Sequence, residues 1–212
     1  MSVLERIAYF QNRRDEAPNR ELAKELVETK DRAGIQEIAA SLWHQEVDVR
    51  SDCIKVMYEV GYLDPTLIAD YAGDVLKLLQ SKNNRLVWGA MITLATIADL
   101  RADELFQHRA EIQQAMAQGS VITVDAAVKA LATVASKKDD YRAELFPHLL
   151  QHLQTCRPKD VAQHAESTLV AVDPGHSAAF VAVLEQRLPD LSSSQATRVR
   201  KAIQAAKAAG SR

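Results

Sequence analysis

Glycine and proline are scarce in this sequence, with 7 and 6 copies among 212 residues. Also missing is any alternation of apolar and polar residues with a period of two, the pattern of a half-buried β-strand. Alanine and leucine are instead the commonest residues, and both favour helices. The absences argue against a sheet, and the composition predicts an all-α fold.

Cysteine is rarer still. Cys53 and Cys156 form no Cys-x-x-Cys motif, so we expect free thiols in a reducing compartment. No apolar run approaches the roughly 18 residues of a membrane span. The opening residues, MSVLERIAYFQNRR, lack the basic start and the continuous apolar core of a signal peptide. Together these features predict a soluble, cytoplasmic protein.

Positive and negative side chains are nearly equal in number. The sequence has 26 Lys and Arg and 28 Asp and Glu, which gives a formal net charge of -2. This balance provides no overall attraction to nucleic acid or to an anionic membrane. Residues 141–212 are locally positive, with 9 basic against 6 acidic side chains, and no acid follows Leu191. We expect a basic helix at this end, either a solvated cap or an anion-binding site.

Short segments of the sequence repeat along the chain. The segment LATIA at 94–98 returns as LATVA at 131–135, an offset of 37 residues. Such an offset is in the range typical of helical-repeat arrays. An apolar stripe with helical spacing recurs at intervals of 37 or 38 residues, starting from Val49, Leu86, Thr123, Val161 and Val199.

Turn signals divide this pattern into paired helices. One pair of amphipathic helices cannot cover its own apolar faces, so successive pairs must stack and share a core. We therefore predict a single domain over residues 1–212, an α-α superhelix of about five to six helical pairs. An atypical helix pair in 1–30 precedes the predicted units, which are 31–61, 65–98, 102–136, 139–172 and 176–209.

The segment EVDVRSDCIKVMYEVG at 46–61 resembles the second helix of a HEAT repeat, with an Asp-Val-Arg opening followed by the small Cys53. The resemblance extends over about 30–212 and is to the HEAT/armadillo-like α-solenoids. It implies that the second helix of each pair lines a concave face that another macromolecule contacts. The other units depart from the Asp-Val-Arg opening, and such arrays serve many functions.

Trp88 lies opposite the apolar stripe of its predicted helix. If neighbouring second helices are roughly 10 Å apart, this tryptophan belongs to an apolar patch with charged residues at its rim. Aromatic anchors surrounded by charge are where interface energy concentrates. The residues predicted to bind a partner are Tyr58, Trp88, Ile92, Lys55, Asp125 and Lys129.

Two other environments remain open for Trp88. Strong curvature could bring neighbouring second helices together, so that the indole fills the gap between them. Alternatively, the indole could be buried in a homodimer. Resistance of its fluorescence to iodide in the monomer would contradict the partner-binding hypothesis.

The sequence offers few candidate residues for catalysis or metal binding. His148 and His152 are four residues apart and could present two imidazoles to zinc, but no HExxH motif or acidic ligand accompanies them. Nucleotide-binding glycine motifs and the GxSxG motif are absent, and neither cysteine has a histidine at a spacing that suggests an activated nucleophile. We therefore expect no enzymatic activity, no cofactor and no metal.

HEAT-like DNA glycosylases provide the alternative, since they use concave tryptophans with a catalytic aspartate and an arginine. Trp88, Asp125, Arg85 and Lys129 are superficially similar to that set, but they do not match its motif. Trp43 is predicted to end a first helix, and concave basic residues are few for phosphate binding. The prediction is thus a noncatalytic scaffold or adaptor for a protein or peptide partner, without nucleic acid or membrane, and the alternative is a DNA-binding or glycosylase-type protein.

Overall fold

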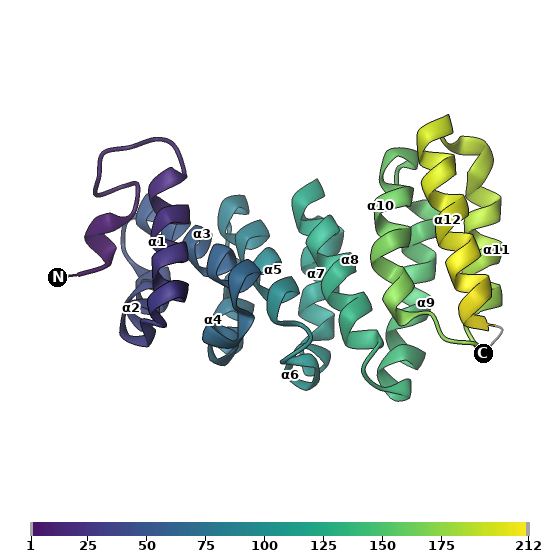
Figure 1. Cartoon of the computed structure of the whole chain (residues 1–212), viewed down its shortest axis with the longest axis horizontal. Coiled ribbons are helices and arrows are strands. Elements are labelled where there is room, and N and C mark those ends of the chain that lie inside the picture. Colours follow the sequence, from purple (N-terminus) through teal and green to yellow (C-terminus); the bar gives the residue numbers. More distant parts are fainter. Residues whose placement is uncertain (1, 211–212) are drawn as a thin grey trace. The chain divides into compact units, whose positions relative to one another are not determined.

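The computed structural model describes residues 2–210, and all regular secondary structure in that range is helical (Figure 1). The predicted all-α class is therefore confirmed. None of the helices in this range is both long and apolar enough to cross a membrane. By internal packing the chain divides into two compact units, Met1–Ala127 and Val128–Arg212.

The first unit contains seven α-helices, and short 3-10 helices lie between several of them. An eighth, α8 (Val121–Ala135), crosses the division between the units. The seven are α1 (Ala17–Thr29), α2 (Arg32–Ala40), α3 (Val47–Leu63), α4 (Ala72–Lys77), α5 (Asn84–Ile97), α6 (Ala102–Gln107) and α7 (Arg109–Gln118).

Predicted first helices of the repeats are broken in this unit. The predicted unit 65–98 begins with two 3-10 turns, followed by the six-residue α4 and a third 3-10 turn. In the next unit, α6 ends at Gln107 and α7 begins at Arg109. Apolar periodicity does not distinguish a continuous α-helix from consecutive short helices that bury the same side chains.

Residues 2–30 differ from the predicted pair of helices. They contain the 3-10 helix Leu4–Arg6 and a single α-helix, α1, which packs against α3. The helix α1 takes the position of the second helix of a repeat, because it packs along one side of α3 and α5 packs along the other side of α3 (Figure 1).

The core of the first unit lies along α3 and α5. Val49, Cys53 and Met57 on α3 are fully buried, as are Ala90 and Leu94 on α5. These residues belong to the predicted apolar stripes, whose burial is the main favourable contribution to folding.

Two glycines allow α3 and α5 to approach closely. A Cβ atom added at Gly89 would lie 2.9 Å from Cγ2 of Ile54, and one added at Gly61 would collide with the side chain of Thr96. Each glycine thus replaces a side chain for which the interface has no space.

The second unit repeats the packing of paired helices. Phe146 and Leu149 from α9 and Phe180 and Leu184 from α11 are fully buried within it. The short α9–α10 connection consists of Cys156 and Arg157. Besides the end of α8, the helices are α9 (Asp139–Thr155), α10 (Pro158–Thr168), α11 (Ser177–Arg187) and α12 (Ser193–Gly210).

The start of α5 offers a test of the local structure that positions Trp88. Asn83 caps this helix, because its Oδ1 accepts hydrogen bonds from the backbone N–H groups of Arg85 and Leu86. We expect Asn83→Ala to lower the free energy of unfolding by about 1 kcal/mol in urea titrations. The neighbouring Asn84 is exposed, so Asn84→Ala should change it by less than about 0.5 kcal/mol. Equal losses in the two variants would contradict the capping role.

Candidate functional site

Trp88 and Ile92 lie one helical turn apart on the face of α5 that is partly open to solvent, and both are half-buried. The opposite face carries Leu86, Ala90 and Leu94, which are buried. Both residues thus lie on the side of α5 where the sequence places them, and the open stripe is the candidate binding surface.

Tyr58 and Lys55 on α3 are buried, which corrects the expectation that both are exposed. Only 5% of Tyr58 and 7% of Lys55 is accessible to solvent. The physical reason is that α1 packs along α3, whereas the sequence interpretation placed residues 1–30 in a separate terminal pair. Tyr58 and Lys55 therefore lie beneath the candidate surface and are not part of it.

Trp88 packs against Tyr58, although it is not enclosed. The two ring centroids are 6.0 Å apart with planes inclined by 51°. Tyr58 also contacts Tyr62 at a centroid separation of 6.0 Å, and Tyr62 is exposed. The indole therefore partly fills the space beside α3, as one alternative predicted, and it also retains solvent contact.

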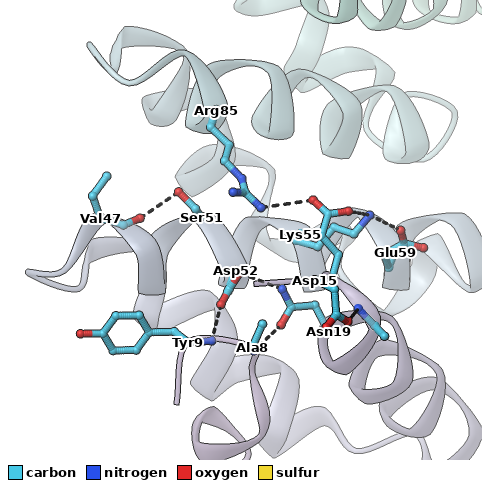
Figure 2. Close-up of polar contacts among 12 residues, drawn as sticks. Ala8, Tyr9, Asp15, Asn19, Val47, Ser51, Asp52, Lys55, Glu59 and Arg85 are labelled. Atoms are coloured by element: carbon cyan, nitrogen blue, oxygen red, sulfur yellow. Dashed lines mark hydrogen bonds and ion pairs between the residues drawn. The ribbon is translucent and has the colours of Figure 1, made fainter. Parts of the chain in front are cut away.

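The buried Lys55 lies between two carboxylates, one of them that of Glu59 (Figure 2). Its Nζ atom lies 2.7 Å from Oε1 of Glu59, 2.9 Å from Oε2 of Glu16 and 4.7 Å from the ring centroid of Tyr58. Burial alone would lower the pKa of Lys55, but hydrogen bonds with Glu59, Tyr58 and Glu16 outweigh burial and raise it above the usual value of a lysine. Lys55 is therefore cationic and already neutralised by its neighbours.

Glu16 links the N-terminal segment to two helices. Besides Lys55 on α3, it pairs with Arg85 on α5, whose guanidinium nitrogen lies 3.2 Å from Oε1 of Glu16 (Figure 2). The glutamate is partly exposed, so each of these contacts is screened by solvent to some degree. The pairing places a carboxylate beside Arg85, the arginine that the glycosylase alternative would use to hold a nucleotide.

A second buried polar cluster fixes the segment before α1. Asp52 accepts hydrogen bonds from the side-chain amide of Asn19 and from the backbone N–H of Tyr9, both at 2.8 Å, while Asn19 accepts one from the N–H of Ala8 at 2.9 Å (Figure 2). A polar cavity of about 230 Å³ adjoins the cluster, and Arg13, Arg14, Asp48 and Arg85 are among its lining residues. These contacts explain why residues 8–16 remain against α3 without regular structure.

Asp125 and Lys129 lie one turn apart on α8. Asp125 is half-buried and Lys129 is exposed. Because α8 crosses the division between the two units, we describe these residues only on their own helix. Their contribution to a charged rim stays a prediction.

Histidines of the second unit are arranged differently from the sequence interpretation. His152 does not pair with His148: its Nε2 atom lies 2.9 Å from Nδ1 of His164 on α10. Cys156 completes a group of three whose ligand atoms are all within 4.8 Å of one another, the only candidate metal-binding group among residues 2–210. His148 has a buried Nε2 atom without a hydrogen-bond partner, and burial lowers its pKa.

Sequence reasoning missed this group for an identifiable reason. The sequence interpretation considered an activated cysteine nucleophile and a histidine pair at 148 and 152, whereas the observed group combines His152 with His164 on another helix and with Cys156, four residues after His152. Four residues is one helical turn, so the two side chains share a face. By contrast, Cys53 is fully enclosed, and burial raises the pKa of its thiol to about 12.

Solved structures show which fold the chain has, although no protein was found that is related to it by sequence. No family model and no curated protein matches the chain. An engineered protein solved by the Northeast Structural Genomics Consortium is similar with a TM-score of 0.69 and 18% identity, covering 99% of this chain and 98% of that one.

Designed armadillo repeat proteins are similar over nearly the same extent. One, solved in complex with the peptide (KR)4, has a TM-score of 0.68 and 16% identity, covering 90% of this chain and 86% of that one. Another, computationally designed for modular peptide recognition, has a TM-score of 0.67 and 13% identity, with coverage of 87% and 86%. The chain therefore has an armadillo/HEAT-like α-solenoid fold, as the sequence predicted.

Removal of the buried cation tests the support beneath Trp88. Lys55→Met leaves Glu16 and Glu59 facing each other without their shared partner, and we expect it to lower the free energy of unfolding by about 2 kcal/mol in urea titrations. The matched control is Lys77→Met, because Lys77 is exposed and pairs only on the surface with Asp74. Its effect should stay below about 1 kcal/mol.

The pH dependence of this difference follows from the raised pKa of Lys55. A raised lysine pKa contributes stability that is complete below the unfolded-state pKa and is lost only as the pH rises through the folded-state value. The difference between Lys55→Met and the unaltered protein should therefore stay constant from about pH 6 to about pH 9. A difference that disappears at neutral pH would contradict the cationic assignment.

Proposed function

We propose that this protein is a noncatalytic scaffold that binds a protein or peptide partner on the open face of α5, with Trp88 as the anchor and Ile92 beside it. The observation that carries the proposal is the half-buried indole, which packs on Tyr58 and still contacts solvent. An aromatic side chain immobilised before binding loses little conformational entropy when a partner covers it.

The packing beneath the anchor favours a binding role. Gly61 and Gly89 bring α3 and α5 together, while the Lys55 cluster holds Tyr58 in place. Supports of this kind keep a contact residue in one geometry, as productive interfaces require. If Trp88 only filled a gap between helices, its exposed side would contribute nothing to that packing, whereas a binding role uses the exposed side.

The charge of the first unit favours a basic partner. Residues 1–127 carry 14 Lys and Arg against 20 Asp and Glu, a net charge of -6, whereas residues 128–212 carry 12 against 8, a net charge of +4. Complementary charge steers association and excludes acidic partners. The designed armadillo repeat protein in complex with (KR)4 provides an example of a similar fold with a basic peptide.

Nucleic-acid binding at the same face has weaker support. Arg85, one turn before Trp88 on α5, and Lys55, beside the ring of Tyr58, each pair with Glu16. A phosphate bound at either cation would lie close to the Glu16 carboxylate, which would repel it. Asp125 and Lys129 are retained in the proposal as residues that set the orientation of the partner.

Comparative affinity capture tests this function. The full chain, Trp88→Ala and Trp43→Ala would be immobilised and the retained proteins quantified by mass spectrometry. Removal of an interface anchor costs about 2 kcal/mol or more, a roughly 30-fold loss of affinity, so specific partners should be lost with Trp88→Ala. Trp43 is an exposed tryptophan at the end of a 3-10 helix, and its variant should retain them.

Three outcomes would oppose the proposal. Retention of the same proteins by all three forms would remove the role of Trp88. Binding of duplex DNA that weakens steeply with salt would favour the nucleic-acid alternative. Dimers of the full chain that dissociate on Trp88→Ala would show that the face is occupied by a second copy.

A further inference from the structure

A cluster of metal-ligating side chains lies where α9 meets α10 in the second unit. His152 is in the last turn of α9, Cys156 directly follows that helix, and His164 is on α10. The imidazole nitrogens of the two histidines are 2.9 Å apart, and their ring centroids are 4.8 Å apart. The cysteine sulfur is within 4.8 Å of both nitrogens.

The distances suit a small tetrahedral site. Zinc binds histidine nitrogen at about 2.0–2.1 Å and cysteine sulfur at about 2.3 Å, which places neighbouring ligand atoms roughly 3.3–3.6 Å apart. The nitrogen pair at 2.9 Å is closer than this and the sulfur lies within 4.8 Å, so rotation of the side chains about their χ angles would be needed to place all three ligand atoms around an ion. We propose that His152, Cys156 and His164 bind a divalent ion of the zinc class, with water or another ligand in the fourth position.

The surroundings restrict the movement of these ligands. Only 1% of His164 is exposed, and the other two are half-buried. Arg187 of α11 donates hydrogen bonds to the backbone carbonyls of Leu153 and Cys156, the latter at 2.8 Å, and so fixes the end of α9. Ligands preorganised on helices in this way lose little entropy when an ion binds.

Local charge is compatible with a cation. The guanidinium of Arg187 is beside Cys156, but its own charge is balanced by Asp190 at 3.3 Å. Asp160, at the start of α10, also lies near the thiol and is itself paired with Arg157 at 2.7 Å, so the charges around the group are largely balanced. Ordinary thiols are mostly protonated at neutral pH, so Cys156 must lose its proton to become a thiolate ligand.

Binding therefore releases one proton, from the thiol, and moves a second proton within an imidazole ring. The Sγ–H proton of Cys156 leaves to solvent as the sulfur–metal bond forms. The proton shared between His152 and His164 moves, through solvent exchange, to an outer nitrogen of its own ring, and both inner nitrogens then have lone pairs for the metal. Mixed imidazole and thiolate donors select zinc-class ions over magnesium and calcium, which prefer oxygen.

Titration of the full chain with Co²⁺, after treatment with a chelator, tests the proposal directly. We expect one equivalent to bind, with the visible bands of tetrahedral cobalt and a near-ultraviolet thiolate charge-transfer band, and Zn²⁺ to displace it. Thermal unfolding should then occur roughly 5 °C higher at a hundredfold excess of Zn²⁺ over its Kd.

Matched variants separate this site from incidental binding. Cys156→Ser should abolish the charge-transfer band, and His164→Asn should weaken binding at least tenfold. His148→Asn, one turn from His152 on the same helix, and Cys53→Ser, the other cysteine, should leave the spectrum unchanged. Because Cys156→Ser removes only a half-buried sulfur, circular dichroism should show that it remains folded.

Several results would overturn the assignment. The unaltered chain could bind no stoichiometric Co²⁺ or Zn²⁺, in which case the histidine pair only connects α9 to α10. Binding that persists in Cys156→Ser with its charge-transfer band intact would place the ion elsewhere, as would equal losses in His148→Asn and His164→Asn. None of these results bears on Trp88, which lies in the other unit.

Discussion

The close approach of α3 and α5 is the constraint on which the first unit depends. Gly89 leaves room for Ile54, and Gly61 leaves room for Thr96, so at each of these points a side chain of one helix packs directly against the backbone of the other. Burial of the stripe residues then stabilises the pair, and Tyr58 comes within reach of Trp88. A larger residue at either glycine would separate the helices and remove the support beneath the indole.

The polar contacts of the N-terminal segment complement this apolar packing. A buried lysine or aspartate would be strongly destabilising alone, yet Lys55 and Asp52 are each satisfied by groups from residues 8–19. The segment therefore supplies hydrogen-bond donors to Asp52 and gives Lys55 a second carboxylate besides Glu59 of its own helix. This dependence explains why the N-terminal region takes the place of a regular helix pair without sharing its apolar pattern.

Periodicity was sufficient to predict the helical class and the side of α5 on which Trp88 lies, because both follow from which residues are apolar. It could not predict the burial of Lys55 and Tyr58, which depends on α1, a helix outside the repeat pattern. Periodicity also could not predict the contact between His152 and His164. This contact depends on the register between α9 and α10, and residue spacing within one helix gives no information about that register.

The repeat itself nevertheless marks both polar clusters once the register is known. The third residue after the start of each stripe is small in three units, as Gly89, Ala126 and Ala202, and polar in the other two, as Asp52 and His164. Both polar residues are buried, and each belongs to one of the clusters described above. A position that faces the interior favours small residues for packing, and a polar side chain there is costly unless it gains specific partners. Departures from a structural repeat at its buried positions are therefore more informative about specific contacts than variation on its surface.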